Sequence, residues 1–196
     1  MRYASIRKLD ISNGDGIGAS LFVQGCHFHC KNCFNSDTWD FNGGNQWTVQ
    51  ETYKFLKIVS NPNIKRVTIL GGEPLCDENV CDVLSLLEEL RNMPDKKIWI
   101  YSGYRFNDIL ASVNSSMQTR HDIARFRSIL IANVMVDGRY VDELKNKNLK
   151  FRGSSNQRVI DLKSTLDNLN ISELYTITDH DKFNEFIDNH IIHLYD

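Results

Sequence analysis

Apolar, β-branched runs alternate along this chain with segments whose apolar residues recur at helical spacing. The runs at residues 19–23, 66–70 and 97–101 predict buried strands. The segments 48–60 and 77–91 predict helices. The first is expected to open with a capping box, in which Thr48 is the N-cap and Glu51 reaches back. Strands that alternate with helices are typical of βαβ units, so we expect an α/β fold with a mainly parallel sheet.

The rest of the chain shows weaker patterns. We expect a short helix over residues 106–111, a strand within 128–136 and a last strand over 158–162, whereas residues 121–126 give no clear signal. Residues 171–178 predict a strand or extended segment, and residues 181–192 a helix. We therefore expect one domain over residues 1–166, followed by a C-terminal extension, residues 167–196, of unassigned role.

Composition narrows the class of protein. The chain has 196 residues, of which 41% are hydrophobic and 24% charged, with a net charge of -2. A net charge this small does not indicate a surface that binds nucleic acid or an anionic membrane. No apolar run approaches the roughly 18 residues of a membrane span. The first ten residues lack the apolar core of a secretion signal. We expect a cytoplasmic protein that binds neither nucleic acid nor membrane.

Cysteines are crowded into one short segment. Three of the five fall within eight residues, at Cys26, Cys30 and Cys33, in the spacing C-x3-C-x2-C. Thiolates select zinc or iron–sulfur clusters, and a structural zinc ion or an ordinary [4Fe–4S] cluster takes four protein ligands. Three thiolates leave one iron without a protein ligand, so the spacing favours a cluster that can bind a small molecule at that iron.

A zinc site is the alternative for this loop. His27 or His29 would complete a Cys3His site, or Cys76 would supply a fourth thiolate from elsewhere in the chain. If the cluster has three thiolates, both histidines are predicted to be solvent-side loop residues. Cys76 and Cys81 are then predicted to be ordinary, partly buried residues, because two cysteines cannot hold a second cluster.

Glycine-bearing turns follow three of the predicted strands, at 71–72, 103 and 138. Ligands of parallel α/β sheets bind at the carboxyl ends of the strands, and the cysteine loop also follows a strand, so we expect these turns and that loop to share one rim. Gly71 and Gly72 allow the backbone to approach a ligand closely. Glu73 is predicted either to pair with a ligand ammonium group or to provide negative charge at the start of the next helix.

These motifs together resemble the radical S-adenosylmethionine (SAM) enzymes. Their signatures are C-x3-C-x2-C after a strand and a GGEP turn, here residues 71–74. The residue before the last cysteine is usually aromatic in that superfamily, but here it is Asn32, and Phe34 and Asn35 follow the cysteine instead. This arrangement resembles the branch that activates anaerobic ribonucleotide reductase, as do the segments DISNGDG (10–16), YSGY (101–104), VDGRY (136–140) and RGSSNQ (152–157).

The resemblance implies a fold and a chemistry. A closed eight-stranded barrel typically needs about 250 residues, so we expect an incomplete, open β/α barrel of the radical SAM type whose open side admits a loop of the partner. The three cysteines would hold a [4Fe–4S] cluster, and SAM would chelate the fourth iron through its amino and carboxylate groups. The residues expected around SAM are Asn32, Cys33, Phe34, Gly71, Gly72 and Glu73.

The resemblance also implies partners. One electron would cleave SAM to methionine and a 5′-deoxyadenosyl radical, which would take a hydrogen atom from a glycine of the large subunit of anaerobic ribonucleoside-triphosphate reductase. The electron would come from a low-potential donor such as flavodoxin. Two alternatives stay open: a radical SAM enzyme acting on a small molecule, as a carboxy-deazaguanine synthase does, and a non-catalytic zinc-binding interaction module.

Overall fold

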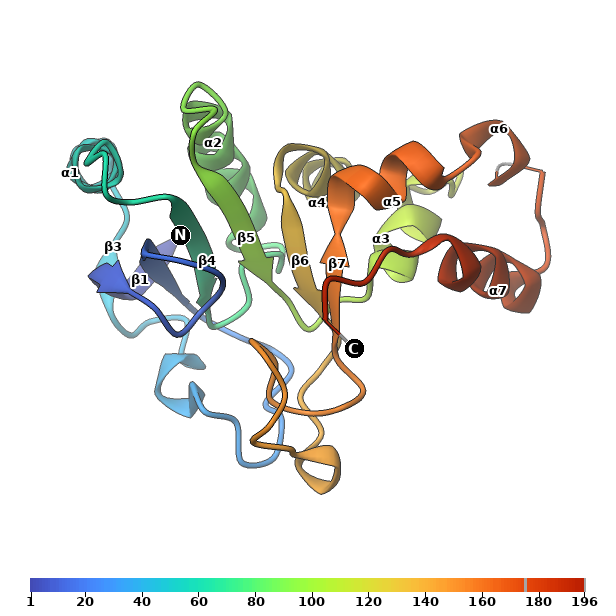
Figure 1. Ribbon diagram of the computed structural model, residues 1–196, viewed down its shortest axis with the longest axis horizontal. Coiled ribbons are helices and arrows are strands. Elements are labelled where there is room, and N and C mark those ends of the chain that lie inside the picture. The colour runs from blue at the N-terminus through green and yellow to red at the C-terminus, as the bar shows by residue number, and fades with distance from the viewer. Residues whose placement is uncertain (175, 196) are drawn as a thin grey trace.

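The computed structural model describes residues 1–174 and 176–195 (Figure 1). The strands are β1 (Arg2–Asp10), β2 (Gly18–Gln24), β3 (Asn45–Gln46), β4 (Arg66–Gly71), β5 (Lys97–Tyr101), β6 (Val134–Asp137) and β7 (Arg158–Asp161). The α-helices are α1 (Val49–Val59), α2 (Val80–Leu90), α3 (Phe106–Val113), α4 (Arg120–Ile131), α5 (Leu162–Asn168), α6 (Ile171–Leu174) and α7 (His180–His190). Short 3-10 helices occur at η1 (Ser36–Thr38) and η2 (Asp142–Leu144).

The strands form one open sheet in the order β3-β1-β2-β4-β5-β6-β7. The four central strands, β2, β4, β5 and β6, are parallel, while β1 and β3 on one side and β7 on the other pair antiparallel. The sheet does not close, because β3 and β7 remain as its two edges. The prediction of an α/β fold with a mainly parallel central sheet is confirmed.

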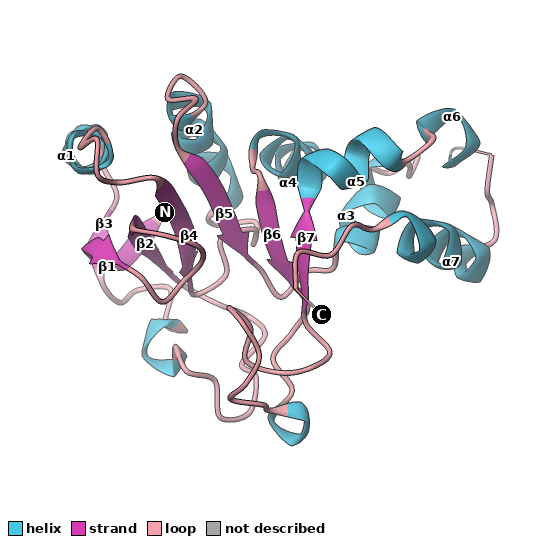
Figure 2. Cartoon of the chain, viewed as in Figure 1, coloured by secondary structure: helices cyan, strands magenta, loops and turns pink. Residues whose placement is uncertain are grey.

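Side chains of the central strands alternate between two apolar cores. In β5, Ile98 and Ile100 belong to the main core, which packs against the helices, whereas Trp99 belongs to a smaller one with Val134, Val136 and Val159. The larger helices lie along one side of the sheet, and long loops extend from the ends of its strands (Figure 2). The face that carries Trp99 is therefore covered by loops and by the chain's end rather than by helices.

Two helices follow the sequence pattern closely. Thr48 caps α1 by accepting a hydrogen bond from the Glu51 amide, as predicted. The glutamate side chain does not reach back in a capping box, because it pairs instead with Lys54 and Tyr3. In α2, whose apolar residues recur at helical spacing, the buried set is Val80, Val83, Leu86, Leu87 and Leu90.

Other segments differ from the sequence predictions. The prediction of a strand or extended segment at 171–178 is wrong over Ile171–Leu174, which form α6, while Tyr175 lies outside the described residues. The strand expected within 128–136 is β6, which begins only at Val134, because residues 128–131 still belong to α4. The strand β1 was not expected. No helix in the described ranges has the length and apolar character needed to cross a membrane.

Candidate active site

A cavity of about 580 Å³ extends from the carboxyl ends of the parallel strands, where the cysteine loop lies, to the β1–β2 loop, which precedes β2. Its walls come from the cysteine loop after β2, the turn after β4, the end of β5, the β1–β2 loop and the long β6–β7 loop. The predicted rim therefore exists, and the glycine turns at 71–72, 103 and 138 all line it. Cavities of roughly 300–1,000 Å³ are the usual size for cofactors and small ligands.

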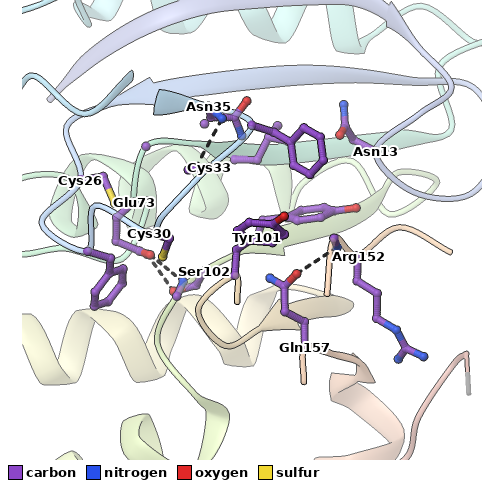
Figure 3. Close-up of a pocket in the computed structure, with 18 of the residues that line it drawn as sticks. Asn13, Cys26, Cys30, Cys33, Asn35, Glu73, Tyr101, Ser102, Arg152 and Gln157 are labelled. Carbon is purple, nitrogen blue, oxygen red and sulfur yellow. Dashed lines mark hydrogen bonds between the residues drawn. The ribbon is translucent and has the colours of Figure 1, made fainter. Parts of the chain in front are cut away.

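The three clustered cysteines all face this cavity (Figure 3). Cys26 is buried and the other two are half-buried. The loop is fixed to η1 by backbone hydrogen bonds, from Gly25 to Thr38 at 2.7 Å and from Cys26 to Trp39 at 3.1 Å. Burial raises the pKa of the Cys26 and Cys30 thiols, so a bound metal would have to displace their protons.

The residues proposed for a zinc site do not gather. Within residues 1–174 and 176–195, no three His, Cys, Asp or Glu side chains are arranged to share one metal ion. His27 lies 2.8 Å from the Glu78 carboxylate, and His29 stacks on Trp39 with ring centroids 4.6 Å apart. Both histidines are exposed, as predicted. In an iron–sulfur cluster, by contrast, each of the three cysteines binds a different iron. The three thiols therefore need only line one cavity and need not converge on a single point.

The GG turn brings two backbones into contact. A Cβ on Gly72 would lie 2.3 Å from the carbonyl oxygen of Gly25, and Gly71 adopts a φ of +111° that other residues rarely take. The amides of Gly72 and Glu73 donate to Val23 and Gly25 at 2.9 and 2.8 Å. These glycines therefore hold the end of β4 against the start of the cysteine loop, on the cavity wall.

Glu73 is buried and its carboxylate is already hydrogen-bonded. It accepts from the Ser102 hydroxyl at 2.7 Å, the Gly103 amide at 2.7 Å and the Leu75 amide at 2.8 Å. Burial raises its pKa to about 7, against the opposing effect of those donors. Glu73 thus ties the end of β4 to the end of β5. It is not an N-terminal charge on the next helix, because α2 begins only at Val80.

Asn32 lies away from the cavity, unlike Cys33, Phe34, Gly71, Gly72 and Glu73. Its left-handed backbone, with φ +56°, turns the amide outward to donate to Asp142 at 2.7 Å. The adjacent residues make a second contact between the same two loops, in which the Lys31 ammonium group donates to the Glu143 carboxylate at 2.9 Å. Asn32 therefore fastens the β6–β7 loop to the cysteine loop, and Asn35 takes a place on the cavity wall.

Two wall residues, Asn13 and Tyr101, were not predicted as site residues, whereas Gln157 belongs to the RGSSNQ segment, which was a candidate for contact with SAM or the partner. Tyr101 lies between the side chains of Asn13 and Gln157 in Figure 3, and its hydroxyl is buried without a hydrogen-bond partner among the described residues. A buried phenol without a partner costs about 1–3 kcal/mol, so this hydroxyl suits a polar ligand group. These residues belong to the YSGY, DISNGDG and RGSSNQ motifs, and membership of those motifs is the sequence feature that could have identified them. Asp137, by contrast, is bonded to Arg158 and to the Phe106 amide, and is structural.

Comparison with known proteins agrees with this site. A family profile described as "4Fe-4S single cluster domain" matches residues 12–160. The anaerobic ribonucleoside-triphosphate reductase-activating protein of Escherichia coli strain K12 is 35% identical over 166 residues, which cover 83% of this chain and 100% of that one. The protein of the same name from Enterobacteria phage T4 is 31% identical over 160 residues, 81% of this chain and 93% of its own. This chain therefore belongs to the family of anaerobic ribonucleoside-triphosphate reductase-activating proteins and contains a 4Fe-4S single cluster domain.

Proposed function

We propose that this protein is a radical SAM enzyme that installs a glycyl radical on the large subunit of anaerobic ribonucleotide reductase. Cys26, Cys30 and Cys33 hold its [4Fe–4S] cluster. The observation that carries the proposal is that three thiols face one cavity whose described lining contains no fourth cysteine and no histidine. Such a lining fits a cluster with one iron left open to an incoming molecule.

The cavity offers suitable groups for SAM beside the cysteines. Phe22, Phe34 and Tyr140 provide apolar and aromatic surface for a purine ring, and Ser12, Asn13 and Tyr101 provide hydroxyl and amide groups. When bound, the cluster supplies the electron that cleaves SAM to methionine and the 5′-deoxyadenosyl radical, which takes a hydrogen atom from a glycine of the reductase. The residues of this chain bind and orient SAM, and they exclude water from the cavity.

The open sheet provides the access that a protein substrate needs. We assign it to the incomplete barrel type of the radical SAM enzymes, with the gap between its two end strands, β3 and β7, as the way in for the glycine-bearing loop. The reducing electron comes from a low-potential donor such as flavodoxin, and the reaction takes place in the cytoplasm.

Metal content and SAM cleavage test the proposal. The protein, reconstituted anaerobically, should hold about four irons per chain. With dithionite it should convert SAM to 5′-deoxyadenosine. Changing Cys26, Cys30 or Cys33 singly to Ala should abolish this cleavage, because each supplies one thiolate. Cys81→Ala is the matched control, since that thiol is exposed and outside the cavity. A colourless zinc protein that leaves SAM intact would contradict the proposal.

A further inference from the structure

The chain's end returns from α7 and lies along the free edge of β7 (Figure 1). This C-terminal tail, residues 191–195, lies beyond the family profile, which stops at residue 160. It pairs antiparallel with β7 through a bridge between Ile160 and His193. Backbone hydrogen bonds of 2.9 Å run from Asp161 to Ile192 and from Leu194 to Val159. The tail therefore occupies the sheet edge where a closed barrel would place another strand.

Tyr195 connects two walls of the cavity. Its hydroxyl donates to the Asp15 carboxylate in the β1–β2 loop, the loop that places Ser12 and Asn13 on the cavity wall. Its ring packs edge-on against Phe151, with centroids 5.4 Å apart, and its carbonyl oxygen accepts from Arg152 at 2.9 Å. Phe151 and Arg152 line the cavity from the β6–β7 loop.

The β6–β7 wall needs such support. Phe151 has a left-handed φ of +57°, which costs a residue other than glycine about 1–3 kcal/mol and persists only where the surroundings enforce it. Its ring contacts Trp99 with centroids 5.4 Å apart and Tyr195 at the same distance. Trp99 is part of the sheet and Tyr195 is not, so the tail supplies one of the two aromatic contacts that this ring makes within residues 1–174 and 176–195.

We propose that Tyr195 is a positioning residue for the active site. Its hydroxyl fixes the β1–β2 loop and its ring fixes Phe151, so that both walls stand at the separation that SAM requires. The tail thus does for this open sheet what a further strand would do for a closed barrel. The identity of the ligand rests on the proposed function, whereas the bond between the two loops does not.

Two substitutions separate the contributions of Tyr195. Tyr195→Phe removes only the hydroxyl bond to Asp15, and should raise amide hydrogen exchange in residues 11–16 while leaving residues 149–153 protected. It should weaken equilibrium binding of SAM by up to about 10-fold, the value of one hydrogen bond. Tyr195→Ala should raise exchange in both loops and weaken SAM binding by up to about 100-fold, since the aromatic pair is also lost.

Kinetics distinguish positioning from general damage to the fold. In Tyr195→Phe the KM for SAM should rise while kcat at saturating SAM and the iron content stay unchanged. Tyr53→Phe is the matched control, because this tyrosine lies exposed on α1 and lines no part of the cavity; it should change neither exchange nor binding. Unchanged exchange in residues 11–16 together with unchanged SAM affinity in Tyr195→Phe would overturn the inference, even if Tyr195→Ala does not fold. If the unaltered protein binds no SAM, the proposed function fails, and exchange alone still tests the bond between the loops.

Discussion

Arg66, at the start of β4, is the main attachment of the β1–β2 loop, and replacing it by methionine should be costly. The side chain is 1% exposed. It donates to Thr68 at 2.9 Å, to the carbonyl oxygen of Asp10 at 2.9 Å and to the Asp10 carboxylate at 3.1 Å. It also donates to the carbonyl oxygens of residues 14–16. One buried cation therefore holds residues 10 and 14–16, on both sides of the Ser12 and Asn13 that line the cavity.

Arg66→Met conserves much of the volume but removes every one of these bonds. The Asp10 carboxylate, 4% exposed, would keep its hydrogen bonds from Ser12 and Asn13 but lose its buried cation. Removing one partner of a buried pair typically costs about 3–5 kcal/mol. For a domain of this size that corresponds to a fall in Tm of roughly 6–20 °C. The loop should also exchange its amide hydrogens faster.

Urea unfolding of the anaerobic protein, followed by circular dichroism, measures the cost. The double variant Asp10→Asn, Arg66→Met should lose less stability than the sum of the two single variants, because the first change removes the charge that the second leaves unpaired. A loss below about 1 kcal/mol for Arg66→Met, or strict additivity of the two changes, would refute this reading of the buried pair.

Three further predictions concern the site and its supports. Glu73→Gln turns an amide NH2 toward one of three donors, and should lower the free energy of unfolding by about 1–3 kcal/mol in urea titrations; an unchanged midpoint would speak against the tie between β4 and β5. Burial favours a raised pKa for Asp10, but hydrogen bonds from Asn13 and Ser12 keep that pKa below its ordinary 3.8. The ionised carboxylate therefore stabilises the fold above about pH 4, and this contribution is lost as acid protonates it, so Asp10→Asn should lose less stability than the unaltered protein between about pH 4 and pH 2. Equal losses would contradict this. Cys76→Ala should keep its iron and its SAM cleavage, because this buried thiol does not line the cavity; complete loss of either would show that Cys76 is a ligand.

Buried strands and helices were predictable from the sequence where their apolar residues follow a continuous or periodic pattern. The run at 19–23 in β2 is apolar because that strand is covered on both faces, and the same holds for most of β4. The strand β1 was missed because its burial is irregular and charged residues such as Arg7 and Lys8 interrupt it; long-range pairing with β2 stabilises it. In α4 the buried positions include Arg125 and Ser128, which weakens the helical apolar pattern.

The candidate site was predictable only as far as its motifs reached. The cysteine spacing and the GG turn identified the elements that meet at the cavity. The roles of single side chains depend on backbone direction, which a motif does not encode: the left-handed conformation of Asn32 sends its side chain to Asp142, away from the cavity. Tyr101 and Arg152 come from segments far apart in the chain, and only the folded sheet brings them to one cavity.

Electron paramagnetic resonance of a mixture with the reductase tests the central claim most directly. The reconstituted protein is incubated anaerobically with the large subunit of the anaerobic ribonucleotide reductase, SAM and dithionite. We predict a glycyl radical signal that requires SAM and disappears when Cys26, Cys30 or Cys33 is changed to Ala. The account would be contradicted if no glycyl radical signal appeared although the protein held its full iron content and the reductase was competent.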